Sequence, residues 1–274
     1  MHILPADDVG WLLPLFDPVL AADSRRRLGQ LGLDANGQDR ALGAIRRALE
    51  SDGYLGRSEL VERLGRLGIE IDAPRRVHLF RLATGEGLAI LGPDRGSETL
   101  LALAHDWIGE RGAHDRDTAV AELTRRYLRA FGPSTEADFA GWSGLPLRDV
   151  RAGLAAVAGE LVEVAIGQER AWTLRDAVRR PRGRIVRLLP AWDNYLMGHR
   201  DRDFIAGPER WPTVMPGGGL IRPTILVDGR AVGTWGMRRK GGSIEVTIDP
   251  FAELDAAVEE AVGAEVQDVQ RFEG

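Results

Sequence analysis

Hydrophobic residues in the region 53–103 recur twice at helical spacing and then form two short apolar runs. Ser58 is a suitable cap for the first helix, and Pro74 begins the second. The apolar runs 88–91 and 99–103 are separated by Gly-Pro-Asp-Arg-Gly, which has the chemistry of a turn. The pattern therefore predicts two helices followed by a β-hairpin.

The region 117–174 repeats this order. An amphipathic helix is predicted over 118–131, a second helix begins near Ser134, and a third covers 146–158 with Pro146 in its first turn. Two apolar runs after the third helix predict another hairpin. Two helices joined by a tight turn and followed by a strand pair form the layout of a winged helix, used mostly on double-stranded DNA.

The two ends of the chain follow other patterns. The N-terminal end, where His2-Ile3-Leu4 resembles the end of a strand, has two helical stretches at 7–23 and 38–51. In the C-terminal end short strands replace helices, Asp228-Gly229 is a hairpin turn signal, and an acidic helix finishes the chain. Its predicted strands are 185–189, 224–227, 231–237 and 243–248, and its predicted helix is 251–272.

The predicted fold class is α+β, with tandem winged helix-turn-helix domains followed by a β-rich C-terminal domain that carries a terminal helix. We interpret residues 1–52 as a helical segment left from a preceding unit. The winged helices are predicted at 53–110 and 111–176, and the β-rich domain at 177–274.

Composition and charge narrow the class of protein. The 274 residues include no cysteine, which excludes disulfides, a thiolate nucleophile and cysteine-rich zinc sites. The net charge is −5, but residues 251–274 alone carry seven acids and one arginine, so the remaining residues are close to neutral. The start of the chain has no signal-peptide pattern, and no apolar run is long enough to cross a membrane. We therefore expect a cytoplasmic protein without a membrane partner.

Local basic clusters supply the candidate contacts to nucleic acid, since local charge decides where phosphates bind. They lie on the third helix of the second repeat, in an arginine run, in an Arg-Asp stretch and at a predicted hairpin tip. The candidates are Arg148, Arg151, Arg179, Arg180, Arg182, Arg184, Arg187, Arg200, Arg202, Arg238, Arg239 and Lys240. Two other readings stay open: a winged helix that binds protein, and an arginine run that is a solvated linker.

The polar, aromatic segment 192–203 also permits an enzyme reading. Asp193 is a candidate base, and His199, Asp201 and Asp203 are candidate metal ligands. Their spacing matches no known metal motif, and the alternation of arginine and aspartate is self-neutralising. We favour a structured loop that packs on the strands, and we expect neither a metal nor a cofactor.

Longer stretches of the chain resemble one family. These stretches are LPADDVGWLL, RRYLRAFGPSTEADFAGWSGLPL, LLPAWDNYLMGHRDRD and RPTILVDGRAVGTW. They are similar to the bacterial winged-helix family that contains the AlkZ-type DNA glycosylases. The resemblance implies three tandem winged helices around a basic cleft shaped for duplex DNA, and hydrolysis of the N-glycosidic bond of alkylated bases.

The catalytic motif of that family is Gln-x-Gln or Gln-x-Asp in its N-terminal part. None of Gln30, Gln38, Gln168, Gln267 and Gln270 is followed two positions later by Gln or Asp. We therefore assign no catalytic residue, and we expect this chain to begin after the family's first winged helix.

The leading hypothesis is a double-stranded DNA-binding protein without an intact catalytic motif. One alternative is an active glycosylase whose gene start has been placed too late. The other is a transcription regulator.

Overall fold

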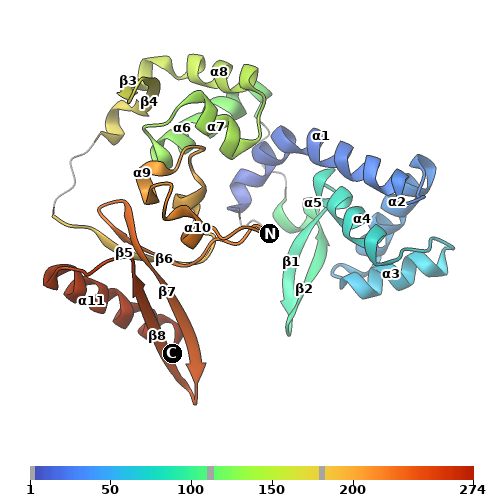
Figure 1. Cartoon of the computed structure of the whole chain (residues 1–274). Coiled ribbons are helices and arrows are strands. Elements are labelled where there is room, and N and C mark those ends of the chain that lie inside the picture. Colours follow the sequence, from blue (N-terminus) through green and yellow to red (C-terminus); the bar gives the residue numbers. More distant parts are fainter. Residues whose placement is uncertain (1–3, 110–113, 179–182) are drawn as a thin grey trace. The chain divides into compact units, whose positions relative to one another are not determined.

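The computed structural model shows helices and antiparallel strands in alternation along the chain, which confirms the α+β class (Figure 1). It describes residues 4–109, 114–178 and 183–274, without the side chains of residues 17 and 18. The chain forms two compact units, Met1–Val120 and Ala121–Gly274. Across the described residues, no helix combines the length and apolar character that a membrane span requires.

The described residues 4–109 of unit 1 form five helices and one hairpin. In chain order these are α1 (Ala6–Gln30), α2 (Ala35–Asp52), α3 (Arg57–Arg66), α4 (Ala73–Gly85), β1 (Ala89–Arg95), β2 (Glu98–Leu103) and α5 (Ala104–Ile108). Asp34 and Asp72 cap α2 and α4 by accepting hydrogen bonds from backbone N–H groups of the first turn. The helices expected near Ser58 and Pro74 are present as α3 and α4. The prediction that Ser58 caps α3 is wrong, because Gly56 is the N-cap residue and its N–H donates to the Glu59 carboxylate.

One apolar core joins all the longer elements of unit 1. Leu28 of α1, Ile45 of α2, Leu60 of α3, Leu79 of α4 and Leu101 of β2 are all buried in it. Because α2 shares the core with α3, α4 and the hairpin, the helix-turn-helix of unit 1 has a preceding helix of its own. The boundary at residue 53 stays a prediction, but this packing favours a unit that starts with α2.

The β1–β2 hairpin turns later than the sequence suggests. The Gly-Pro-Asp-Arg stretch belongs to β1, and the chain reverses at Gly96 and Ser97. The ladder is interrupted between Leu91 and Asp94. Pro93 lies at this irregularity, where its missing N–H removes no regular ladder bond. The prediction of a turn at residues 92–96 is therefore wrong. Pro93 lies at an irregularity within β1, and the turn follows β1.

Unit 2 begins within α6 (Arg116–Phe131). The elements after α6 are α7 (Glu136–Ser143), α8 (Leu147–Ala156), β3 (Leu161–Ile166), β4 (Glu169–Leu174), β5 (Val186–Leu189), α9 (Asp203–Ala206), α10 (Trp211–Val214), β6 (Thr224–Val227), β7 (Arg230–Lys240), β8 (Ser243–Pro250) and α11 (Ala256–Glu273). An isolated antiparallel β-bridge between Ser134 and Trp172 ties the α6–α7 connection to the β3–β4 hairpin. Leu55 and Leu101 make the same bridge in unit 1.

The four strands predicted in this region are present, and they form one antiparallel sheet in the order β5-β6-β7-β8. Val258 and Val262 of α11 pack on its apolar side chains, among them Val186 and Ile225. A second cluster joins Leu226 of β6 to the short helical segments between β5 and β6. The sheet is thus packed against α11 and against the segment that contains the AWDNYLMGHRDRD motif.

Candidate nucleic-acid interface

Helix α8 is the third helix of the second repeat, and its sequence fixes which face it exposes. Gly144 ends α7 with a φ of 72°, a left-handed conformation that glycine adopts without strain, and Pro146 precedes α8. Val150 and Leu154 are buried on the inner face. Leu147, Arg148 and Arg151 lie on the outer face, where the Arg148 side chain is 83% exposed and that of Arg151 63%.

Both α8 arginines have carboxylate neighbours. Nε of Arg148 lies 3.3 Å from Oδ1 of Asp149, and Nε of Arg151 donates to Oε2 of Glu136 at 2.8 Å. Ion pairs at this exposure contribute about 0–1 kcal/mol each. The guanidinium groups can therefore exchange these carboxylates for a phosphate at little cost.

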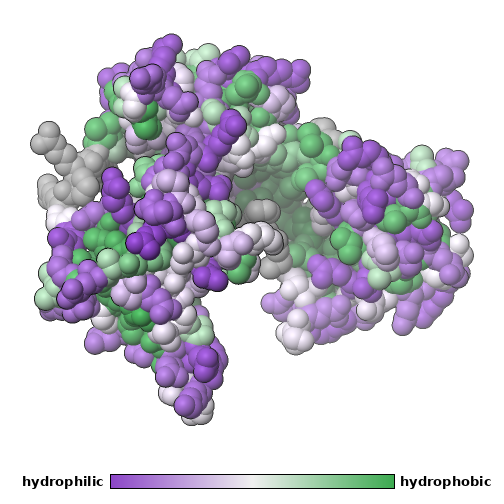
Figure 2. Space-filling model, viewed as in Figure 1, coloured by the Kyte–Doolittle hydropathy of each residue, from purple (hydrophilic) through white to green (hydrophobic). Residues whose placement is uncertain are grey.

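The outer end of the β7–β8 hairpin is a two-stranded arm. The β6 partners of β7 end at Thr234, whereas β7 and β8 stay paired out to Lys240 and Ser243. Figure 2 shows a strongly hydrophilic surface at the end of this arm. Within the described part of the chain, neither the Arg238 guanidinium nor the Lys240 ammonium has an ion-pair partner, while Arg239 donates to Glu273 at 2.7 Å.

The acidic helix α11 neutralises part of the arginine run. Arg184 donates to both carboxylate oxygens of Asp255, at 3.0 and 2.7 Å, and Arg187 donates to Glu265 at 3.1 Å. The backbone N–H of Val258 and the Arg184 guanidinium together hold the pKa of Asp255 below its usual value. Arg179, Arg180 and Arg182 lie outside the described residues.

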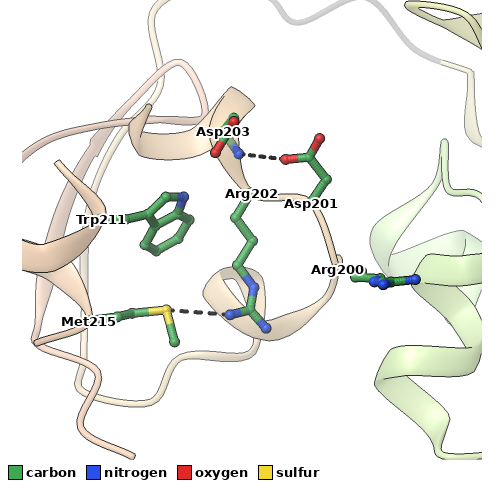
Figure 3. Close-up of a pocket in the computed structure, with 6 residues that line it drawn as sticks. All are labelled: Arg200, Asp201, Arg202, Asp203, Trp211 and Met215. Carbon is green, nitrogen blue, oxygen red and sulfur yellow. Dashed lines mark hydrogen bonds between the residues drawn. The ribbon is translucent and has the colours of Figure 1, made fainter. Parts of the chain in front are cut away.

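The Arg-Asp stretch does not neutralise itself. Asp201 accepts from the backbone N–H of Asp203 at 2.9 Å, and Arg202 donates to the His199 carbonyl and contacts Met215 Sδ and the Trp211 ring (Figure 3). These residues line an open depression of about 270 Å³. Arg202 is thus engaged in the fold, and its DNA contact stays a prediction.

Arg200 differs from its neighbours because its guanidinium has no hydrogen bond or ion pair to any described residue. Figure 3 shows it pointing away from Trp211 and Met215. Its backbone N–H, by contrast, donates to Oδ1 of Asp138 at 2.7 Å. The side chain is therefore available while the main chain is fixed.

Residues 193–199 have structural partners, as expected for a loop packed on the strands. Asp193 accepts from the N–H of Tyr195, whose hydroxyl donates to the Gly229 carbonyl at 3.0 Å. The ring of His199 contacts the Phe131 carbonyl through Nε2 at 2.9 Å. Among the described residues no group of three or more His, Asp or Glu is arranged to hold a metal ion.

Helix α4 is the third helix of the first repeat, as α8 is of the second, and none of its arginines is among the contacts predicted from the sequence. Arg75 donates to the Leu31 carbonyl at 2.9 Å, and Arg81 lies 3.9 Å from Asp23 of α1. Within the helix-turn-helix pattern, the basic PRRVH start of α4 was a local signal that could have drawn attention to it.

A helix-turn-helix with an exposed basic third helix, followed by a strand pair, is an architecture found among DNA-binding proteins. The family model described as "DNA glycosylase AlkZ-like" matches residues 1–272, so the chain belongs to the AlkZ-like DNA glycosylase family. This confirms the resemblance carried by the sequence motifs.

Two comparisons with individual proteins agree with this family. An interstrand DNA cross-link repair glycosylase of Streptomyces sahachiroi is 27% identical over 198 residues, which cover 69% of this chain and 52% of that protein. The chain therefore spans about half the length of this curated relative. The solved structure of the S. sahachiroi DNA glycosylase AlkZ matches with a TM-score of 0.77 and 24% identity, over 96% of this chain and 74% of that one. At this identity the structural match establishes the fold.

Proposed function

We propose that this chain is a double-stranded DNA-binding protein in which the two helix-turn-helix and hairpin repeats are winged helices. The observation that carries the proposal is the outer face of α8, where Arg148 and Arg151 are exposed on the third helix of a helix-turn-helix. That helix is the element which enters the major groove in this class of fold. Family membership supports a role on DNA.

The β7–β8 arm is a second surface for the same duplex. Arg238 and Lys240 are cations without an ion-pair partner in the described residues, and the arm extends beyond the rest of the sheet. Its charge favours phosphate contact, which is independent of DNA sequence. We expect the protein to act in the cytoplasm.

We also propose that the residues of this chain do not form a complete glycosylase centre. Glycosidic hydrolysis needs a group that activates or orients water beside the sugar carbon. The Gln-x-Gln or Gln-x-Asp motif that supplies this group in the family is absent from the sequence. Gln38, the one buried glutamine, donates to the carbonyls of Arg25 and Leu33 and serves the fold.

Binding of a labelled duplex, measured by fluorescence anisotropy over a range of salt concentrations, tests the main proposal. We expect binding at low salt and a linear fall of log K with log salt, since each neutralised phosphate contributes about −0.9 to the slope. Absence of binding at low salt, or affinity that is independent of salt, would refute it.

The two alternative functions give different results in the same assay. A transcription regulator prefers one sequence over random duplex, whereas a repair protein prefers alkylated duplex in any sequence context. Release of an alkylated base by the purified chain would overturn the absence of a catalytic centre, and the family assignment makes this outcome the second candidate function.

A further inference from the structure

The carboxylate of Asp138 joins two segments that are far apart in the sequence. Asp138 is only 6% exposed and lies in the first turn of α7. Its Oδ2 accepts from the backbone N–H and the hydroxyl of Thr135, which is a capping box. Its Oδ1 is left for a different partner, the backbone N–H of Arg200, at 2.7 Å.

The ionised form of Asp138 is the form that makes these bonds. Burial acts to raise the pKa of Asp138, but the Thr135 donors, the Arg200 N–H and the nearby His199 outweigh it, so the pKa lies below the usual value. A buried carboxylate without such donors would be strongly unfavourable. The hydrogen bond from the Arg200 N–H therefore helps to stabilise the buried carboxylate of Asp138.

Further contacts hold residues 198–200 against α6. The Tyr127 hydroxyl donates to the Gly198 carbonyl at 2.8 Å, and the His199 ring makes edge contacts with the Phe131 ring of α6 and the Phe204 ring of α9. Gly198 is packed so closely on the Phe131 ring that any side chain at this position would collide with it. The main chain at Arg200 is thus held in two ways: the preceding residues Gly198 and His199 are packed on α6, and the Arg200 N–H is bonded to Asp138.

The constrained main chain places the Arg200 side chain beside α7. A Cβ atom placed on Gly141 of α7 would lie 3.8 Å from Cβ of Arg200, so the arginine leaves the main chain beside α7. In a helix-turn-helix the helix that precedes the recognition helix crosses the phosphate backbone. A guanidinium beside α7 that has no protein partner among the described residues is therefore a candidate to bind a backbone phosphate when α8 is in the groove.

We infer that Asp138 is a positioning residue, which fixes the main chain of Arg200 so that its guanidinium binds a phosphate of duplex DNA beside α7. The inference rests on the proposed DNA binding and adds a contact and its support to it. A pre-organised arginine loses less conformational freedom on binding than a mobile one.

The first experiment compares Arg200→Gln with Arg271→Gln. Arg271 is an exposed arginine of α11 paired with Asp268, so both variants change the net charge equally. We expect R200Q to bind duplex DNA about three- to fivefold more weakly and to reduce the salt slope by about 0.9, the contribution of one phosphate. R271Q should keep both the wild-type affinity and the wild-type slope.

The second experiment compares Asp138→Asn with Thr224→Val. Thr224 is a fully buried residue of β6 whose hydroxyl donates to the Arg222 carbonyl at 2.9 Å. Both variants remove a side-chain hydrogen bond from unit 2, but only D138N loosens the Arg200 N–H. We expect D138N to reduce the salt slope as R200Q does, and the double variant D138N/R200Q to bind no more weakly than R200Q. The T224V variant should lower thermal stability without changing the slope.

The outcomes separate the two proposals. If the wild-type chain does not bind duplex DNA, the proposed function and this inference both fail. If it binds but R200Q keeps the full slope, only the inference fails. Amide hydrogen exchange of the wild-type protein tests the positioning role even if D138N does not fold: the Arg200 amide should be protected, and exchange at the rate of an unstructured amide would contradict the inference.

Discussion

The two helix-turn-helix repeats have the same order of elements but expose different faces of their third helices. In unit 1, α1 packs along α4. A Cβ atom built on Gly85 at the end of α4 would lie only 3.6 Å from Cβ of Leu20 and from the backbone nitrogen of Ala21. Arg25 of α1 also forms an ion pair with Glu86, which follows α4. Among the described residues of unit 2 no helix covers α8 in this way, and Arg148 and Arg151 remain exposed.

Each repeat receives its support from a different neighbour. Unit 1 is supported by α1, which precedes the repeat in the sequence and packs on its third helix. The α6–α8 repeat is supported by residues 198–200, which follow it in the sequence and contact α6 and α7. The same layout can therefore serve mainly as a packed scaffold or present its third helix to a ligand, depending on where the supporting segment lies.

The largest expected effect tests whether α1 is an integral part of unit 1. Leu28 is fully buried in the core that α1 shares with α2, α3 and α4. We expect Leu28→Ala to lower the free energy of unfolding of unit 1 by about 2–5 kcal/mol, as cavity-forming leucine substitutions do. Urea unfolding followed by hydrogen exchange resolves the loss to residues 4–109.

Val19→Ala is the matched control, because Val19 lies on the same helix and is 67% exposed. It should change the stability by less than about 0.5 kcal/mol. If L28A lowers the free energy of unfolding no more than V19A does, α1 is not an integral part of the core of unit 1. The packing of α1 on α4 would then not explain the difference between α4 and α8.

The next effect tests the support of the second repeat through pH. Removing the charged acceptor in Asp138→Asn should cost about 2 kcal/mol at neutral pH. The pKa of Asp138 is lowered in the folded state, so its stabilisation is complete above the unfolded pKa of about 4 and is lost as the pH falls through the folded value. The stability difference between wild type and D138N should thus be constant from pH 7 to 5 and shrink below about pH 4. A difference that persists unchanged at pH 2 would contradict the ionised role of Asp138.

Local patterns predicted the elements well where each element carries its own signals. Pro146 and the buried positions Val150 and Leu154 define the start and the inner face of α8. Asp228-Gly229 marks the β6–β7 turn, and the four strands predicted on either side of it are present as β5 to β8. The turn of the β1–β2 hairpin was misplaced, because a proline-containing stretch is compatible with both a turn and a bulge.

Long-range partners could not be predicted in this way. Arg184 and Asp255 are 71 positions apart, and Asp138 and Arg200 are 62 apart. No periodicity links such residues. The sequence therefore predicted Arg184, Arg187 and Arg239 as free cations, whereas each is paired with a carboxylate of α11 or of its N-cap residue Asp255. Likewise, the covering of α4 by α1 depends on tertiary packing, which the amphipathic pattern of either helix alone does not specify.

The third effect compares the two third helices directly. Arg148→Gln removes an exposed cation from α8, and Arg81→Gln removes one from α4. We expect R148Q to weaken duplex binding about three- to tenfold and to reduce the salt slope by about 0.9, in line with one lost phosphate contact. R81Q should stay within about twofold of wild type. Equal losses in anisotropy titrations would mean that both helices contact DNA and that α1 does not exclude α4 from the interface.

The smallest expected effect is a gain of affinity. Glu273 of α11 accepts a hydrogen bond from Arg239 in the β7–β8 arm, where it competes with any phosphate. Because an exposed ion pair contributes at most about 1 kcal/mol, releasing Arg239 in Glu273→Gln should strengthen duplex binding only about two- to threefold at low salt. Glu259→Gln is the control, since Glu259 lies on the same helix and has no basic partner among the described residues. If both variants gain equally, the effect comes from the net charge of α11, and the arm contributes no specific contact. If only E273Q gains affinity, the arm binds DNA as α8 does. The second unit then carries two DNA-binding surfaces, the outer face of α8 and the β7–β8 arm, and the first unit has no counterpart of either.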